Sequence, residues 1–450
     1  MQAAGRYAAG SSADGATMIT IGVPAEGKDE PRIGLTPDTV KKLVKAGAQI
    51  TVRSGAGSRS QYTDKEYSDA GAKIAKSDAQ AVSGADVVFT VRRPPVALAR
   101  AMKKGAALIG MLDPYSDAKG LDALAKTGVS MFSMELMPRI TRAQSMDVLS
   151  SQSNLAGYKG VIDAAAAFGR ALPMMMTAAG TVPAARIFVM GVGVAGLQAI
   201  ATARRLGAIV TATDVRPAAK EQVASLGAKF IAVEDEEFKQ AETSGGYAKE
   251  MSAAYKKKQA ALIADHVKNQ DIVISTALIP GRPAPKLISK AMIESMRPGS
   301  IIVDLAAERG GNAELTKPGA IAEHKGVRIF GPLNLPGQVP VNASSLYARN
   351  LQAFLDPFID KEKKTLAIDW DDELAKGTAI SRDGAIVSAM VAEALGGKPI
   401  NAAAKPAPKR ATSTRTTTKT APAKRASAKA ARAKRSARTK APAKTDQHDA

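Results

Sequence analysis

The glycine-rich turn GVGVAG at residues 191–196 constrains the fold of this 450-residue chain more than any other feature. It follows an apolar, strand-like segment (187–190) and opens a helix-like segment (197–206). Asp214 lies 18 residues after Gly196, at the end of the next strand-like segment. In this context the glycines let the backbone approach a pyrophosphate, and the helix N-terminus faces its charge. The sequence therefore predicts a dinucleotide site at Gly191, Gly193 and Gly196; the alternative is a glycine-rich packing turn.

Asp214 indicates which dinucleotide binds. A carboxylate at this position accepts hydrogen bonds from the ribose hydroxyls of NAD and repels a 2′-phosphate. Arg216, two residues later, is a residue type that can accept that phosphate, so NADP stays open as the alternative. The sequence favours NAD.

From Met18 onward, strand-like and helix-like segments alternate, which is typical of parallel sheets. We expect an α/β protein with two doubly wound Rossmann-like domains, mostly parallel sheets and a helix at 156–171. Thr36 is expected to cap a helix that ends at Gly47. The predicted divisions are a disordered N-terminus (1–17), a discontinuous first domain (18–150 and 335–397), an NAD(H)-binding domain (151–334) and a disordered Lys/Arg/Ala-rich tail (398–450).

Composition narrows the chemistry. Aromatic residues make up 4% of the chain, so the core must consist mainly of aliphatic residues. There is no cysteine, which excludes disulfides and thiolate metal sites, and we expect no metal. The signatures HExxH, GxSxG and GxxxxGK[ST] do not occur. No uncharged run reaches 18 residues, so we expect no transmembrane helix. Residues 1–17 lack the apolar core of a secretory signal.

The histidines do not suggest a proton donor. An enzyme that oxidises an alcohol or amine moves a proton as well as a hydride, usually with histidine, lysine or a carboxylate. The three histidines are His266, His324 and His448; the first two are typical of surface positions and the third lies in the tail. Hydride transfer between two nicotinamide rings is an example of a redox reaction that needs no such group.

The segment PRITRAQSMDVLSSQSNLAGY (138–158) is unusually polar. Arg139, Gln144, Asp147 and Ser150 offer donors and acceptors that can hold a nicotinamide carboxamide and ribose while one ring face stays open to a second nucleotide. A polar interdomain hinge is the alternative reading of this segment.

These segments together resemble a known family. PRITRAQSMDVLSSQSNLAGY, PMMMTAAGTVPAARIFVMGVGVAGLQAIATARRLGA, TSGGYAKEM and TALIPGRPAP resemble the NAD(H)-binding alpha component of proton-translocating nicotinamide nucleotide transhydrogenase, with the likeness running from about Met18 to Gly397. The resemblance implies an alanine dehydrogenase-like fold and direct hydride transfer between NAD(H) and NADP(H) held on a partner subunit. It also implies proton movement through membrane-spanning subunits, a peripheral location on the cytoplasmic face of the inner membrane, and a homodimer.

The resemblance also assigns roles to residues. Arg139, Gln144, Asp147 and Ser150 would surround the nicotinamide, with Arg139 able to pair with Asp147 and Gln144 directed toward the second nucleotide. The remaining predicted cofactor contacts are Val192, Gly193 and Val194 (pyrophosphate and adenosine), Asp214, Val215 and Arg216 (ribose), and Gly246, Gln259 and Leu278.

Tyr247 matches a residue of a mobile loop that closes over NAD(H). The sequence supports such a lid separately, because about 35 residues separate two strand-like segments here, which is long for this fold. Gly245 and Gly246 give the segment backbone freedom. A surface loop with a packing tyrosine is the alternative.

Two positions depart from alanine dehydrogenases, which carry a lysine and a histidine for their amino acid substrate. Arg92 lies near the lysine position and Met111–Asp113 near the histidine position. Transhydrogenases often have HLG where this chain has MLD. The MLD difference leaves the local structure at 111–113 open. The missing lysine and histidine argue against the alternative function, a soluble alanine or amino acid dehydrogenase using NAD; a non-catalytic NAD sensor is a further alternative.

Residues 401–450 carry 14 Lys/Arg and 2 Asp/Glu. Such a segment cannot bury enough apolar surface to fold, and a solubilising role is its simplest interpretation. Contact with anionic lipid is a second possibility. Because no aromatic residues are interspersed, we expect no specific nucleic acid binding.

Overall fold

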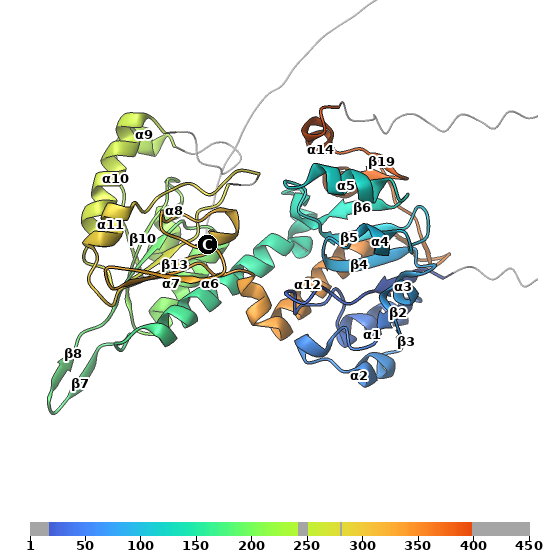
Figure 1. Cartoon of the computed structure of the whole chain (residues 1–450), viewed down its shortest axis with the longest axis horizontal. Coiled ribbons are helices and arrows are strands. Elements are labelled where there is room, and N and C mark those ends of the chain that lie inside the picture. Colours follow the sequence, from blue (N-terminus) through green and yellow to red (C-terminus); the bar gives the residue numbers. More distant parts are fainter. Residues whose placement is uncertain (1–17, 242–250, 280, 398–450) are drawn as a thin grey trace, which may run out of the picture. The chain divides into compact units, whose positions relative to one another are not determined.

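The computed structural model describes residues 18–241, 251–279 and 281–397, which contain two mainly parallel sheets with helices around them (Figure 1). The strand order of the first sheet is β3-β2-β1-β4-β5-β6, and every pairing is parallel. Its strands are β1 (Thr20–Val23), β2 (Gln49–Arg53), β3 (Lys73–Ala75), β4 (Val87–Arg92), β5 (Ala107–Met111) and β6 (Ser130–Ser133). The helices between them are α1 (Pro37–Lys45), α2 (Asp64–Asp69), α3 (Asp78–Val82), α4 (Val96–Ala99) and α5 (Ala118–Ala125).

The second sheet has the order β11-β10-β9-β12-β13-β15-β14, with only β14 antiparallel to its neighbour among these strands. Its strands are β9 (Arg186–Met190), β10 (Ile209–Thr213), β11 (Lys229–Phe230), β12 (Ile272–Ser275), β13 (Ile301–Asp304), β14 (Ile321–His324) and β15 (Val327–Phe330). Its helices are α7 (Val194–Arg205), α8 (Ala219–Ser225), α9 (Glu236–Lys239), α10 (Ala253–Val267) and α11 (Lys290–Ser295). The predicted fold class, α/β with two Rossmann-like sheets, is confirmed.

Further elements connect or flank the sheets. Within the described ranges they are α6 (Val148–Ala167), α12 (Pro340–Leu355), α13 (Glu373–Thr378), α14 (Ala389–Ala394), six short 3₁₀ turns, and the hairpins β7–β8 (Met175–Thr177, Gly180–Val182), β16–β17 (Ile359–Asp360, Thr365–Leu366) and β18–β19 (Ser381–Arg382, Ala385–Ile386).

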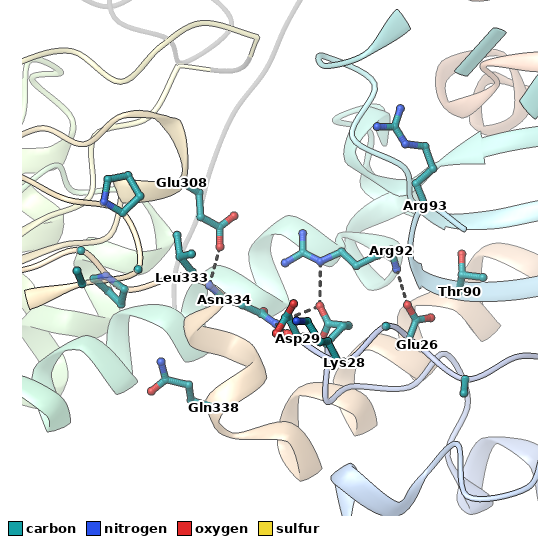
Figure 2. Close-up of a pocket in the computed structure, with 18 of the residues that line it drawn as sticks. Glu26, Lys28, Asp29, Thr90, Arg92, Arg93, Glu308, Leu333, Asn334 and Gln338 are labelled. Atoms are coloured by element: carbon teal, nitrogen blue, oxygen red, sulfur yellow. Dashed lines mark hydrogen bonds and ion pairs between the residues drawn. The ribbon is translucent and has the colours of Figure 1, made fainter. Parts of the chain in front are cut away.

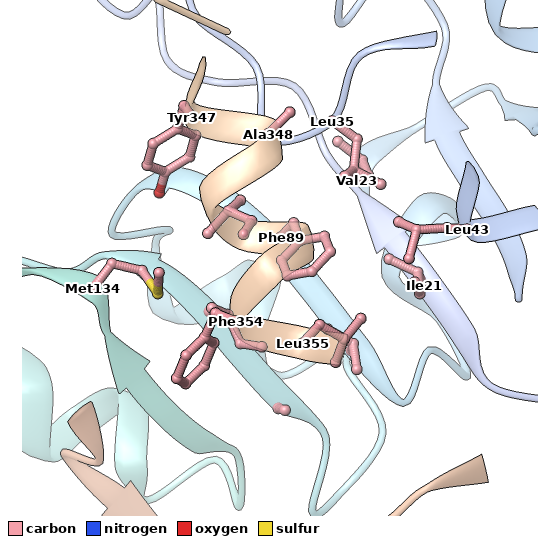
Figure 3. Packing of buried hydrophobic residues seen from close by; sticks show 14 of the residues in the cluster. Ile21, Val23, Leu35, Leu43, Phe89, Met134, Tyr347, Ala348, Phe354 and Leu355 are labelled. Carbon is pink, nitrogen blue, oxygen red and sulfur yellow. The ribbon is translucent and has the colours of Figure 1, made fainter. Parts of the chain in front are cut away.

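Helix α12 packs into the core of the first sheet, although more than 200 residues separate it from the sheet's last strand (Figure 3). Ile21 and Phe89 on the strands and Phe354 and Leu355 on the helix are all buried in one apolar cluster. Tyr347 adds a hydrogen bond between the helix and β4, because its hydroxyl donates to the Thr90 carbonyl (2.8 Å). The C-terminal part of the described chain therefore completes this core. The exact domain boundaries stay a prediction.

The polar segment 138–158 is largely helical, and the predicted start of the helix at residue 156 is wrong: α6 begins at Val148 and ends at Ala167. Asp147 is its N-cap and accepts a hydrogen bond from the Ser150 N–H (2.8 Å). The polar side chains of the first turns find partners elsewhere: Gln152 is buried, accepts from Arg32 (2.7 Å) and donates to the Ala343 carbonyl (3.2 Å). Tertiary hydrogen bonds thus stabilise the first turns of α6, which lack the apolar face on which a sequence-based helix prediction depends.

Several predictions fall outside the described residues. They concern the N-terminus (1–17), the proposed lid with Gly246 and Tyr247, and the tail (398–450).

Candidate functional site

The glycine turn joins β9 to α7 and has the geometry of a close backbone approach. Gly191 has φ +97°, a conformation that favours glycine. A Cβ at Gly196 would lie 1.9 Å from the Gly191 carbonyl oxygen, so only glycine fits there. A Cβ at Gly193, the N-cap of α7, would meet nothing within 4 Å. Gly196 therefore packs tightly against the backbone of the turn, whereas the backbone at Gly193 is open to a ligand.

The turn lies where the strand order of the second sheet reverses, because β9 has β10 on one side and β12 on the other. Ligands of doubly wound folds bind in the crevice outside the strand ends at this point. The Thr276 hydroxyl, just after β12, donates to the Gly191 carbonyl (3.0 Å) and ties the two strand ends together. Three predicted contacts, Val194, Val215 and Leu278, keep 38%, 38% and 50% of their surface exposed around this crevice. Exposed apolar side chains here suit the flat faces of nucleotide rings.

Asp214 follows β10 at the same edge, and its carboxylate is fully engaged. Val192 N–H donates to Oδ2 (2.7 Å), and the Arg216 side chain donates through Nε to Oδ1 (2.9 Å) and through Nη2 to Oδ2 (3.0 Å). Arg216 Nη2 also donates to the Val192 carbonyl (3.1 Å). The structure thus brings together all the predicted residues of the adenosine end: the glycines, Val192, Val194, Asp214, Val215 and Arg216.

Gln259, another predicted contact, is buried beneath this edge. Its amide accepts from the Val233 N–H (2.9 Å) and donates to the Thr213 hydroxyl (3.1 Å). These bonds join the end of β10 to the segment after β11. They give Gln259 a supporting role in this structure, and its contact with a cofactor stays a prediction.

The predicted nicotinamide residues lie at the start of α6 (Asp147, Ser150), in the 3₁₀ turn Thr141–Met146 before it (Gln144) and just ahead of that turn (Arg139). Arg139 and Gln144 are exposed, whereas Asp147 and Ser150 are partly buried at the helix N-cap. Ten residues further along α6, or about 15 Å, Gly157 packs against the fingerprint: a Cβ there would lie 2.0 Å from the Ala195 carbonyl oxygen. One rigid helix therefore connects the two groups of predicted residues. The Arg139–Asp147 pair stays a prediction.

A second crevice lies at the carboxyl ends of β1 and β4, where the first sheet reverses its order. Here a cleft of about 1430 Å³ is lined by the segments after these strands and by residues 308, 318–321 and 330–334 of the second half of the chain (Figure 2). None of the predicted site residues that the structure describes lies in its lining.

Charged residues build this cleft. Glu30 pairs with the buried Arg32 (2.7 Å) and with Arg92 Nε (2.8 Å), and Asn334 donates to it from the opposite side (3.1 Å). Burial alone would raise the pKa of Glu30, but hydrogen bonds and charge from the two arginines lower it to about 2. Arg92, which lies near the position of the lysine of alanine dehydrogenases, is thus committed to a carboxylate.

Glu26, also in the cleft, behaves in the opposite way. Burial raises its pKa to about 7, against the effect of the Val91 and Arg92 N–H groups that donate to it. Both carboxylate oxygens accept these backbone hydrogens (2.6 and 3.1 Å), so Glu26 anchors the end of β4.

The MLD segment forms a contact between the two halves. Met111 is buried, and Asp113, at φ +49°, pairs with Arg309 (2.7 Å), which follows β13. Burial would raise the pKa of Asp113, but hydrogen bonds from Ser116 and Arg309 hold it below its usual value. The partly buried Glu135 fixes this turn by accepting the Asp113 N–H (2.9 Å).

Some supporting residues were missed from the sequence. Asn312 is fully buried and holds the segment after β12 through hydrogen bonds with Ala277 N–H (3.1 Å) and O (2.8 Å). A lone asparagine after two glycines was the only signal for it. His266 bonds to Thr211 (2.8 Å), and His324 bonds to Glu294 (2.8 Å).

Within the described ranges, no helix combines the length and apolarity needed to span a bilayer. Family models match both halves of the chain: alanine dehydrogenase/PNT, N-terminal domain, over residues 22–156, and alanine dehydrogenase/PNT, C-terminal domain, over residues 160–389.

Individual proteins show the same likeness. The chain is 54% identical to an NAD(P) transhydrogenase alpha subunit of Rhodospirillum rubrum over 82% of its own length and 98% of the relative. The crystal structure of a transhydrogenase from Sinorhizobium meliloti is similar with a TM-score of 0.75 and 54% identity, covering 82% of this chain and 100% of that one. An L-alanine dehydrogenase structure gives 0.70 and 26%, covering 84% and 99%.

Proposed function

Because this chain belongs to the alanine dehydrogenase/PNT family, we propose that it is the NAD(H)-binding alpha component of a proton-translocating transhydrogenase. In this function it exchanges hydride directly with NADP(H) held on a partner subunit, and membrane-spanning subunits couple the exchange to proton movement. The chain would then be a homodimer on the cytoplasmic face of the inner membrane, with the basic tail available to anionic lipid.

The observation that carries this proposal is the combination of an intact nucleotide turn with a cleft that lacks the amino acid machinery. Gly193 leaves room for a pyrophosphate, so the residues fit NAD(H). In the cleft, Arg92 is bound to Glu30 and cannot take a proton as a lysine can; beside the cleft, Asp113 is bound to Arg309. The similarity to transhydrogenase subunits at 54% identity, against 26% for the alanine dehydrogenase structure, supports the same choice.

The nicotinamide ring of bound NAD⁺ supplies the hydride acceptor. The protein's contribution is to hold and orient it: the N–H groups at the start of α7 face the pyrophosphate, and Asp214 accepts from the ribose. Arg139, Gln144, Asp147 and Ser150 hold the nicotinamide end and leave one ring face for the second nucleotide. Because a hydride passes from ring to ring, no protein group has to donate or accept a proton at the reacting carbon.

The test is to mix the purified chain with an NADP-loaded partner domain and follow reduction of an NAD analogue by NADPH. We expect turnover that depends on both proteins, and none when alanine or pyruvate replaces the partner. Turnover with alanine and NAD⁺ by the chain alone would establish the dehydrogenase instead. In that case Glu26 would be the candidate general base, because its pKa of about 7 suits that role.

A further inference from the structure

Arg216 is bound to the carboxylate that the ribose of NAD is expected to use. Asp214 accepts four hydrogen bonds: Oδ1 from the backbone N–H and Nε of Arg216 (both 2.9 Å), and Oδ2 from the Val192 N–H (2.7 Å) and Arg216 Nη2 (3.0 Å). A carboxylate offers about four lone-pair sites in total. Its acceptor capacity is therefore used up by these bonds.

Two of these four donors can leave and two cannot. The Val192 and Arg216 N–H groups belong to backbone that the glycine turn and the end of β10 hold in place. The guanidinium of Arg216 is on a long side chain that is 28% exposed and also donates to the Val192 carbonyl (3.1 Å), whereas Asp214 is only 9% exposed. A ribose hydroxyl that donates to Asp214 must therefore displace the arginine side chain.

We propose that Arg216 is an internal competitor for the ribose site, and that the Asp214–Arg216 pair, rather than Asp214 alone, sets the choice between NAD and NADP. This inference rests on the proposed function, because it concerns the same nucleotide site. While Asp214 is present, the arginine fork is bound to it and is not offered to a 2′-phosphate. Once the carboxylate is neutralised, the same planar fork can bind a phosphate with two parallel hydrogen bonds.

The first test is Arg216→Gln in the full-length chain, with NADH binding measured by fluorescence titration. Removing the competitor frees two acceptor positions on Asp214, so we expect NADH to bind about three- to tenfold more tightly. If Arg216 instead contacts NAD(H) directly, the variant binds NADH more weakly, and that result would overturn the proposal, as would no change. Arg205→Gln, at the far end of α7, is the matched control for the lost charge, and we expect no effect from it.

The second test is Asp214→Asn, which keeps an oxygen for the Val192 N–H but removes the negative charge. We expect weaker NADH binding and NADPH binding at least tenfold tighter than in the unmodified chain. The double variant with Arg216→Gln should lose the gain in NADPH affinity; if it keeps the gain, the arginine is not the phosphate receptor. Asp214→Ala serves as a second version, and thermal unfolding confirms that each variant is folded.

The outcomes separate the two proposals. An unmodified chain that binds NADH, with variants that do not follow this pattern, removes the competitor role and leaves the proposed function intact. An unmodified chain that does not bind NADH at all removes both.

Discussion

The two sheets reverse their strand order in the same way, yet the crevices at the two reversals have different chemistry. At the reversal between β9 and β12, a tight turn follows β9, and α7 begins at Val194, four residues after the last residue of β9. At the reversal between β1 and β4, a longer loop of residues 24–36 follows β1 before α1 begins. The first arrangement presents a helix N-terminus to a ligand, whereas the second presents the charged side chains of the loop (Figure 2).

This difference shows that topology places a crevice and the length of the turn decides what it can bind. A short glycine turn recognises a ligand through backbone N–H groups, which suit a phosphate of any nucleotide. A longer loop must use side chains, and here Arg32, Glu30 and Arg92 largely satisfy one another. Substitutions in the two crevices can test this contrast, starting from the largest expected effect.

Three glycine-to-alanine changes should separate packing from binding. Gly196→Ala places a Cβ 1.9 Å from the Gly191 carbonyl oxygen, so we expect about 2–4 kcal/mol of destabilisation together with loss of NADH binding. Gly193→Ala meets nothing within 4 Å, so stability should change by less than about 0.5 kcal/mol, while NADH binding weakens at least tenfold because the backbone can no longer approach the pyrophosphate.

The matched control is Gly27→Ala in the first crevice, where a Cβ also meets nothing within 4 Å. Stability from chemical denaturation and NADH affinity should both stay unchanged. If this variant weakens NADH binding as much as Gly193→Ala does, the cofactor uses the first crevice as well, and the contrast between the crevices is wrong.

Glu26 predicts a pH dependence that originates in the first crevice. Its pKa is about 7 in the folded chain, above the usual value of a glutamate, so it stabilises the fold most below pH 4.5 and this contribution is lost as the pH rises through 7. In the parent chain we expect the free energy of unfolding to fall by up to about 2 kcal/mol between pH 4.5 and 7.5, and in Glu26→Gln this fall should be absent. The fall is smaller than the full value of the pKa shift would give, because the side chain is only partly buried.

The measurement is urea denaturation of both proteins across this pH range. Glu30 supplies an internal comparison, because its pKa of about 2 gives stability that is present above pH 4.5 and is lost only as the pH falls toward 2. Equal slopes for the parent and the Gln variant between pH 4.5 and 7.5 would contradict the assignment to Glu26.

The contrast also explains what could be predicted from the sequence. The glycine turn, the strand before it and Asp214 depend on local signals, namely a short apolar run, a turn and a helix start, and all of them lie where the sequence indicates. Thr36 and Gly47 likewise mark the ends of α1.

The features that were missed depend on distant partners. Gln152 is buried because it meets Arg32, 120 residues away in the sequence, and this contact lets a polar segment form the first half of α6. Asn312, and the supporting hydrogen bonds of Gln259, likewise involve partners that no local pattern reveals. A polar side chain in a core can be placed only when its hydrogen-bond partner is known, since an unpaired polar group there is costly.

The smallest expected effect concerns Asp113 and Arg309, which connect the two halves beside the cleft. Their side chains remain 40% and 42% exposed, so we expect a coupling energy of about 0.5–1 kcal/mol in a double-mutant cycle with Asp113→Asn and Arg309→Gln. The pair should also strengthen NADH binding by up to about fivefold at low salt, because it limits how far the halves separate around the cofactor; about 1 M salt should remove this effect.

The control for this cycle is the pair Lys65–Asp69 within α2, which is more exposed and joins no separate parts of the chain. It should give no more than about 0.5 kcal/mol of coupling and no change in NADH binding. If the Asp113–Arg309 cycle gives the same result as this control at every salt concentration, the MLD segment has no part in joining the two crevices. The two crevices would then act independently, and the glycine turn alone would hold the nucleotide.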